Sequence, residues 1–136
     1  MIAATRDMGF LKARSRAALT PDARAIAYLD AKGDTQAMLV FDRWTPASAE
    51  VHMASDNPVA LYRLIRPAAQ WAFVQAGLTS LTGVMRSSNS RGIRFAKRAG
   101  FREVWRQSHG WNDAEDMVVL EMRREDCRWA PKEQRS

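Results

Sequence analysis

The segment from Asn89 to Phe101 constrains the fold of this chain more than any other part of the sequence. On a helical wheel with ~100° per residue, its apolar side chains share one arc and its cationic side chains share the opposite arc. Gly100 is placed to end the helix in the left-handed conformation, so that Phe101 can fold back onto the last turn. The pattern predicts an amphipathic helix with a basic outer face. The apolar arc holds Gly92, Ile93, Phe95, Ala96 and Ala99, and the basic arc holds Arg91, Arg94, Lys97 and Arg98.

Basic residues are concentrated in and around this segment. The chain has a formal net charge of +6, and seven basic residues with a single acid, Glu103, lie between Arg86 and Arg106. Guanidinium groups match the geometry of phosphate and stay charged at neutral pH, so the segment suits an anionic partner. A solvated helix face explains the same pattern without any ligand. The charge pattern alone leaves both interpretations open.

Apolar runs and turn residues elsewhere predict short strands and two further helices. Asn57 followed by Pro58 predicts the start of the longer of these helices, and Pro67 predicts a kink in it near Arg63. The element order predicts an α/β (mixed α+β) fold, in which a single sheet of about six strands has helices on both faces. The expected strands are 24–30, 36–42, 50–54, 80–85, 103–107 and 116–123, and the expected helices are 7–18, 58–76 and 90–99.

Length and composition fit one globular domain over residues 1–136, with a helical and abbreviated N-terminal part at 1–22. The chain has 136 residues, of which 46% are hydrophobic and 26% are charged. Its single cysteine, Cys127, can form no internal disulfide, which favours a reducing compartment. The acids near His109 fit no zinc-site spacing, so we expect no metal. No apolar run approaches ~18 residues and residues 1–10 lack a signal-peptide pattern, so we expect a cytoplasmic protein that does not enter a membrane.

The segment from Asn89 to Phe101 resembles the N-x-x-[AS]-x-x-[LV]-x-x-[KR]-x-G-F block of the GNAT acyltransferases. The resemblance is strongest to the branch that acetylates ribosomal-protein N-termini and, in style, to compact members encoded by phages and prophages. Residues 60–78, with Phe73 and Gly77, are similar to the same branch. The similarity covers roughly residues 50–129, and it implies a GNAT-like fold and transfer of an acyl group from coenzyme A to an amine.

The resemblance also implies where the co-substrate lies. An acyl-CoA, acetyl-CoA or a related thioester, is expected between two splayed parallel strands, here 50–54 and 80–85. In the family a backbone amide near the end of the first strand, here near Met53 and Ala54, polarises the thioester carbonyl, as a preorganised donor does in any oxyanion site. Asn89 matches a family residue that contacts the co-substrate, and it is also placed to cap its helix. The cofactor-binding positions implied are Met53, Ala54, Ser55, Leu61, Arg63, Asn89, Gly92, Phe95 and Arg98.

The loop expected to bind the pyrophosphate departs from the family pattern. Many members have Q/R-x-x-G-x-G/A there, because glycines let backbone amides approach phosphate. Residues 55–60 of this chain, Ser-Asp-Asn-Pro-Val-Ala, contain no glycine. Asp56 would repel a phosphate that it faced, and Pro58 has no amide to donate. Arg63, one turn later, is placed to supply positive charge instead.

A second departure concerns the proton donor for the leaving thiolate. Many family members have a tyrosine at the position of Ala96. Either water, Ser88 or another group protonates the thiolate, or the protein does not turn over.

Glu50 and His52 are the candidate catalytic residues. They alternate with Val51 and Met53, so both side chains leave the same face of a strand. Acyl transfer to an amine needs a base that removes the ammonium proton, and a carboxylate beside an imidazole can orient it for that task. We assign Glu50 as base or orienter and His52 as base. The alternative is that His52 is a half-buried polar residue that is hydrogen-bonded within the sheet.

Three functions from different classes follow from these observations. The first is an acyl-CoA-dependent N-acyltransferase that passes an acetyl or similar group directly to an amine in a ternary complex. The second is a GNAT-like enzyme of phage origin that modifies a nucleic-acid base, and the third is a catalytically degenerate binding module. The acceptor is a small molecule, a protein or a nucleic acid, and a homodimer is compatible with the sequence. A phage-encoded protein would work in the host cytoplasm.

Overall fold

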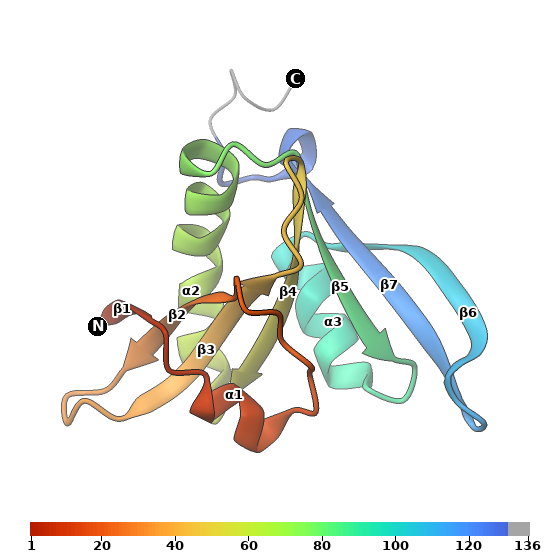
Figure 1. Cartoon of the computed structure of the whole chain (residues 1–136), viewed down its shortest axis with the longest axis horizontal. Helices are drawn as coiled ribbons and strands as arrows, with labels where there is room; N and C mark the ends of the chain where they lie inside the picture. Colours follow the sequence, from red (N-terminus) through yellow and green to blue (C-terminus); the bar gives the residue numbers. More distant parts are fainter. Residues whose placement is uncertain (131–136) are drawn as a thin grey trace.

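A computed structural model describes residues 1–130 as one seven-stranded sheet with helices on both faces (Figure 1). The strand order is β1-β2-β3-β4-β5-β7-β6. The expected α/β fold is confirmed, with seven strands in place of about six. The strands are β1 (Ile2–Thr5), β2 (Arg24–Leu29), β3 (Thr35–Asp42), β4 (Ser48–Ser55), β5 (Ser80–Arg86), β6 (Arg102–Asn112) and β7 (Glu115–Arg123). The helices are α1 (Gly9–Arg14), α2 (Pro58–Gln70) and α3 (Ser90–Ala99), with a π-helical turn η1 (Trp71–Gln75) and a 3-10 turn η2 (Arg124–Asp126).

The N-terminal part differs most from the expectation. Residues 2–5 form the additional strand β1, which pairs antiparallel with β2 from Ile2↔Tyr28 to Thr5↔Ala25. The helix expected over 7–18 is reduced to α1, because the backbone becomes extended at Ser15. Leu11 is the buried residue of α1 and packs against β2 and β3. β1 is formed through its pairing with β2, which is distant in the sequence. Residues 2–5 alone therefore show no strand pattern.

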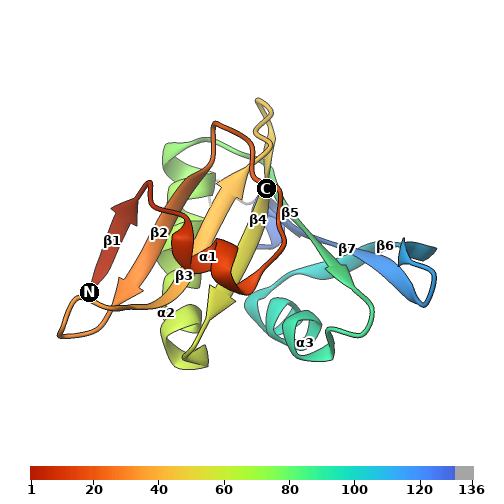
Figure 2. The same ribbon diagram turned by 60° about the horizontal axis from the view of Figure 1, so that its bottom comes forward.

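The sheet separates two apolar layers. Figure 2 shows α1 in front of the sheet and α2 behind it. Side chains alternate along a strand, so odd-numbered residues of β3 and β4, such as Phe41 and Val51, face α2. Even-numbered residues such as Met38 and Val40 face α1. This alternation places the side chain of every even-numbered β4 residue on the α1 side of the sheet.

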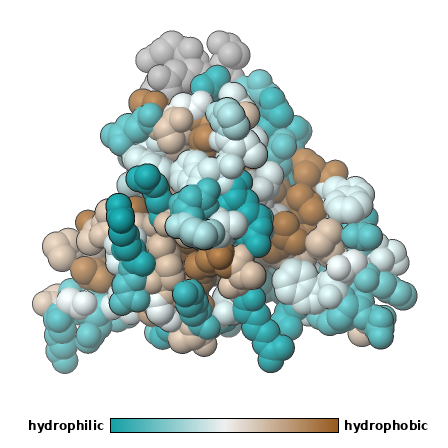
Figure 3. Space-filling model, in the orientation of Figure 1, coloured by the Kyte–Doolittle hydropathy of each residue, from teal (hydrophilic) through white to brown (hydrophobic). Residues whose placement is uncertain are grey.

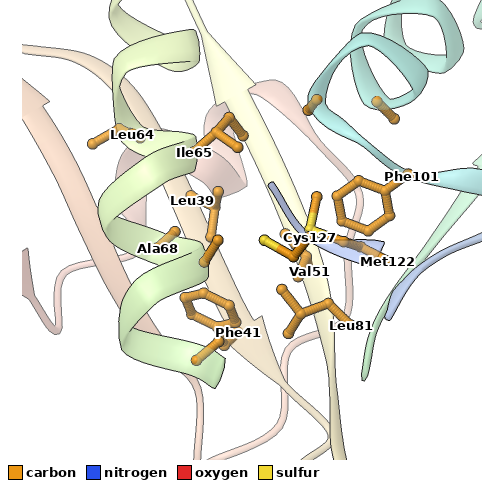
Figure 4. Close-up of a cluster of buried hydrophobic side chains, with 14 of the residues drawn as sticks. Leu39, Phe41, Val51, Leu64, Ile65, Ala68, Leu81, Phe101, Met122 and Cys127 are labelled. Carbon is orange, nitrogen blue, oxygen red and sulfur yellow. The ribbon is translucent and has the colours of Figure 1, made fainter. Parts of the chain in front are cut away.

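The larger core lies between the sheet and helices α2 and α3 (Figure 4). Ile93 of α3 packs there, and Phe101 folds under the helix with 6% of its surface exposed. Gly100 has a φ of 115°, the left-handed conformation that an ordinary side chain disfavours, and it caps α3. The predicted amphipathic helix and its glycine cap are confirmed.

Helix α2 also starts where the sequence predicts. Asn57 caps it and Pro58 is its first residue. The helix continues through Arg63 and Pro67, and a wider π-helical turn follows at Trp71–Gln75. None of the helices within residues 1–130 has the length and apolar character that a membrane crossing requires.

Strands β4 and β5 separate after a short parallel contact, which is the feature of the fold that matters most for function. Their pairing covers Ser48↔Ser80, Ala49↔Leu81 and Glu50↔Thr82. Beyond this point β4 stays paired with β3 as far as Ser55, while β5 stays paired with β7 as far as Arg86. The strands therefore diverge like the arms of a V, as Figure 1 shows, and the expectation of two splayed parallel strands is confirmed.

Strand β6 is longer than expected, because it includes the region around His109 for which we expected a loop. It runs antiparallel to β7 and has register shifts between Glu103 and Trp105 and between Gln107 and Asn112. Backbone pairing holds the hairpin together, although most of the β6 side chains are exposed. An exposed strand of this kind lacks the apolar alternation by which strands are recognised in a sequence.

Candidate active site

The divergence of β4 and β5 leaves backbone groups of β4 directed into the gap. Val51 directs its carbonyl toward β5, because a Cβ built on Gly83 would lie 3.9 Å from that oxygen. The N–H of Asp56, an even-numbered residue, bonds instead to the carbonyl of Gln36 on β3 at 2.9 Å. The direction of backbone groups alternates along a strand, so the N–H of Met53 points into the gap. The ladder with β5 ends at Glu50, so this N–H has no strand partner within residues 1–130.

His52, the residue before Met53, belongs to a network of charged groups on the α1 side of the gap. Its Nε2 lies 2.7 Å from Oδ1 of Asp42 on the neighbouring strand β3. A carboxylate that accepts from Nε2 places a proton on that nitrogen, so in the neutral imidazole the lone pair lies on Nδ1. Nδ1 has no hydrogen-bond partner within the described part of the chain. In its neutral form the imidazole is therefore held in one tautomer, in which Nδ1 is the basic nitrogen.

Asp42 is fully buried, and both of its carboxylate oxygens accept hydrogen bonds. Its second oxygen, Oδ2, accepts the N–H of Thr20 at 3.2 Å and a guanidinium N–H of Arg43 at 2.9 Å. Arg43 has a φ of 48°, a strained conformation for a residue with a side chain. Its guanidinium also donates to the carbonyl of Ala18 at 2.7 Å. A buried charge is tolerated only when paired and hydrogen-bonded, and Asp42 meets both conditions.

Glu50 completes the network at a longer distance. One carboxylate oxygen lies 3.7 Å from Nε of Arg43 and the other lies 4.0 Å from Nε2 of His52. The structure thus brings the predicted pair Glu50 and His52 together on one face. It adds Asp42, which sequence reasoning missed, as the residue that contacts the imidazole directly.

The same three side chains are close enough to meet at one metal ion, because their ligand atoms lie within 4.8 Å of one another. Both oxygens of Asp42 are already engaged, by His52, Thr20 and Arg43. A guanidinium in contact with the carboxylates supplies the positive charge that a metal would bring. We therefore interpret the cluster as a hydrogen-bonded charge network.

The start of α2, where the family binds pyrophosphate, presents no free first-turn amides. The side chain of Asn57 accepts the N–H groups of Val59 and Ala60 at 3.1 and 3.5 Å. Its backbone carbonyl accepts the N–H of Leu61 at 3.1 Å, and Pro58 has no N–H. These donors are used by the helix cap itself, so a phosphate here would depend on cationic side chains.

Asp56 does not face this helix end as an isolated charge. Its carboxylate forms a two-pronged ion pair with Arg14 of α1, with contacts of 2.8 and 2.7 Å. These hydrogen bonds hold the pKa of the Asp56 carboxyl below its ordinary value. Arg63 donates to the hydroxyl of Tyr28 on β2 at 2.9 Å, which places its guanidinium on the far side of α2 from β5. The repulsion expected from Asp56 is thus neutralised, by Arg14.

The positions implied on α3 lie along the second arm of the V. Asn89 caps the helix by accepting the N–H of Gly92 at 3.0 Å. A Cβ on Gly92 would lie 2.5 Å from the Asn89 amide, so glycine is what lets this cap close. The ring of Phe95 meets Tyr62 of α2 edge-on at 6.3 Å, and Arg98 is exposed. The helices therefore meet through their aromatic side chains.

The six remaining positions named from the sequence lie in the core, at a strand end or in a side-chain hydrogen bond. Leu61 is buried in the larger core. Ala96, at the position of the family tyrosine, lies on the buried face of α3 and is 1% exposed. Ser88 donates to the carboxylate of Glu115. Met53 packs its side chain against the larger core, while Ala54 packs on the α1 side and Ser55 ends β4.

No protein-family model and no curated protein matches the sequence. Solved structures match the fold. Spermidine/spermine N-acetyltransferase SpeG from Vibrio cholerae, in complex with manganese ions, matches with a TM-score of 0.67 and 14% identity over 76% of this chain and 66% of that chain. A mutant of spermidine N-acetyltransferase SpeG from the same organism matches with a TM-score of 0.66 and 14% identity over the same shares. The match spans just under two thirds of the length of these chains. It confirms that the chain has the GNAT fold.

Proposed function

We propose that this chain, which has the GNAT fold, is an acyl-CoA-dependent N-acyltransferase that transfers an acetyl or similar group directly to an amine. One observation carries the proposal. At the point where β4 and β5 separate, the N–H of Met53 enters the gap, and the adjacent residue His52 presents an oriented imidazole on the α1 side. A donor for a carbonyl oxygen and a base for an amine thus stand one residue apart.

The residues of β4 and α3 fit an acyl-CoA in the gap. When bound there, acyl-CoA would supply a thioester whose acyl group passes to the amine nitrogen as the C–S bond breaks, and the coenzyme would leave as a thiol with the second proton that the nitrogen loses. Met53 donates its N–H to the carbonyl oxygen, where negative charge develops, and such a donor contributes about 3 kcal/mol in comparable sites. Asn89, Gly92, Phe95 and Arg98 follow the family positions along α3.

His52 acts as the base in this proposal. Nδ1 accepts the ammonium proton of the acceptor, and Asp42 holds Nε2–H so that the ring keeps the tautomer with Nδ1 free. Asp42 touches neither substrate, so it is a positioning residue. Glu50 is held by Arg43 and borders the place where the amine approaches.

Calorimetry with acetyl-CoA tests binding, and 3′-dephospho-CoA tests the part played by cationic side chains. A thiol-release assay over small amines, peptides and oligonucleotides then tests transfer, with spermidine included because the structural neighbours act on it. Binding that is saturable and thiol release that requires an amine would support the proposal. An unchanged melting temperature with about 1 mM acetyl-CoA would overturn it, because any ligand of the native state raises stability.

The outer face of α3 favours a second candidate function, nucleic-acid binding in a base-modifying enzyme or in a binding module. It carries no acid, and its cations have no ion-pair partner within residues 1–130. Four phosphate contacts on a nucleic acid would give a log-log salt slope of about −3 through released counterions, whereas a single coenzyme is too small to hold such a counterion atmosphere. Fluorescence anisotropy with a labelled oligonucleotide across a salt series distinguishes the two. The cations are Arg91, Arg94, Lys97 and Arg98.

A further inference from the structure

Three apolar side chains form a row across the second half of the sheet. The register pairs Val84 of β5 with Val119 of β7, and Val119 with Trp105 of β6. Paired residues of neighbouring strands point to the same face, so the three side chains stand side by side. Strands lie ~4.8 Å apart, so the row extends roughly 10 Å from β5 to the edge of the sheet.

This row is on the α1 side of the sheet and is open to solvent. Glu50 and Thr82 pair in parallel, so Thr82 and Val84, two residues later, share the face of Glu50 and His52. Helix α1 lies against β3 and β4 on that face. Val84 and Val119 remain partly exposed, and Trp105 is 53% exposed. Figure 3, drawn from this side, shows apolar side chains gathered over β5 and β7.

The row begins at the gap, across from the catalytic network. His52 follows Glu50 by two residues on β4, just as Val84 follows Thr82 by two residues on β5. The two side chains therefore stand at the same level on opposite arms of the V. An amine held near His52 would place its own carbon skeleton directly over Val84, with Val119 and Trp105 beyond it.

The charges around the row do not suit a polycation. Glu121 pairs with Arg102 across β6 and β7 and lies 3.8 Å from Arg123, so guanidinium groups accompany this acid. Arg86 shares the face at the far side of the row, since it pairs with Met117. Arg86 likewise acts on Glu115, so the acids of β7 on this face already have guanidinium groups beside them. A ligand with several ammonium groups along its length would have to compete with these guanidinium groups. An apolar skeleton with one ammonium group would not.

We propose that the acceptor is a primary amine on an apolar carbon skeleton, which lies over Val84, Val119 and Trp105 with its amino group at His52. The position of the amino group rests on the proposed function, whereas the affinity of the row for an apolar skeleton does not. Apolar area removed from water supplies the affinity, and the exposed indole supplies most of that area. The inferred acceptor class thus differs from the polyamine named for the structural neighbours.

The kinetic test compares 4-phenylbutylamine, whose ring reaches the end of the row, with ethylamine and spermidine in the thiol-release assay. We expect 4-phenylbutylamine to have the lowest KM. Trp105→Ala should raise that KM about tenfold and leave the KM of ethylamine unchanged. Trp111→Ala is the matched control, because Trp111 lies on the same strand and is similarly exposed, at 47%. Equal effects of both variants, or a lower KM for spermidine, would overturn the inference.

A binding measurement separates this inference from the proposed function. In the absence of coenzyme, 4-phenylbutylamine should shift the NMR signal of the Trp105 indole N–H, assigned by its loss in Trp105→Phe, and should leave that of Trp111 in place. The same shift without any thiol release would sustain the apolar row and reject the acyltransferase. Thiol release without a selective shift at Trp105 would sustain the acyltransferase and reject the row.

Discussion

The two ends of the gap between β4 and β5 differ in how their polar groups are arranged. At the α1 side, His52 is fixed by a fully buried carboxylate, and two more hydrogen bonds, from Thr20 and Arg43, fix that carboxylate in turn. At the start of α2, the backbone donors that a phosphate would use are occupied by the side chain and carbonyl of Asn57. The proposed base therefore lies in a hydrogen-bonded network, while the proposed phosphate site would rely on charged side chains.

The two ends of the gap share no residue, so each can be altered without changing the other. In the proposed function, a loop without glycine would alter how the co-substrate is held and would leave the geometry around Met53 and His52 unchanged. Variants near His52 should therefore change turnover, and variants near the start of α2 should change the affinity for acetyl-CoA.

The largest effect is expected at the catalytic end. His52→Gln should lower kcat about 10²- to 10⁴-fold, the range that a general base contributes, with the dissociation constant of acetyl-CoA unchanged. Steady-state kinetics and calorimetry on the same preparation check this. A variant that kept its turnover would show that His52 is the polar structural residue of the alternative interpretation.

Asp42→Asn should follow with a smaller loss of kcat than His52→Gln, because the imidazole remains but loses its fixed tautomer. The ¹⁵N shifts of the His52 ring report the tautomer directly, which a purely structural role would not change. Glu50→Gln is the matched control, since its carboxylate is 4.0 Å from the ring rather than 2.7 Å. If Glu50→Gln abolished turnover and Asp42→Asn did not, the roles would be reversed.

At the phosphate end, Asn57→Ala should lower the free energy of unfolding by about 1 kcal/mol through the lost helix cap. Val59 and Ala60 would then have free N–H groups, so acetyl-CoA should bind as tightly as before or more tightly. Urea unfolding and calorimetry measure the two quantities. Weaker binding in proportion to the lost stability would mean that the capped turn already contacts the phosphates.

The smallest effect is expected from Arg14→Gln, which leaves Asp56 without its partner. Acetyl-CoA should bind about threefold more weakly at low salt, and the difference should fade near 1 M salt, where charges are screened within ~3 Å. Asp56→Asn is the control and should not weaken binding. Identical salt curves for Arg14→Gln and the unmodified protein would place Asp56 outside the field of the phosphates.

The ion pair between Arg14 and Asp56 also makes the stability of the fold depend on pH. Arg14 lowers the folded-state pKa of Asp56, so the unfolded chain binds the proton more tightly. The pair thus contributes stability above the ordinary carboxyl pKa, and that contribution is lost as pH falls through the lowered value. Both side chains are substantially exposed, so the acid-unfolding midpoint of Asp56→Asn should shift only slightly.

Features of the fold that depend on neighbouring residues could be predicted from the sequence, whereas most of those that depend on pairing between distant segments could not. Helix α3, its Asn89 cap and its Gly100 end depend on neighbours in sequence, and each was predictable. Strand β1 depends on pairing with the distant strand β2, from Ile2↔Tyr28 to Thr5↔Ala25, and its residues carry no pattern of their own. Edge strand β6 was shortened in the prediction for a similar reason, because its exposed side chains do not alternate.

The candidate site divides in the same way. Alternation along one strand placed Glu50 and His52 on a common face, and this needed no partner strand. Asp42 could be found only through the register Asp42↔Glu50, which depends on the connection between β3 and β4. Its one signal was an acid at the end of an apolar run. The direction of Arg63 depended on how α2 rotates against the sheet, which no local pattern specifies.

The three residue pairs between β4 and β5 are the seam that joins two half-sheets. Few backbone hydrogen bonds bind these halves, so the angle between them is set by the side chains packed behind the seam. A cavity of about 10 Å³, bordered by Val51, Leu81 and Phe101, lies there. These side chains pack between the two half-sheets on the α2 side. Substitutions that enlarge or shrink them should therefore change the angle between β4 and β5, and with it the width of the gap.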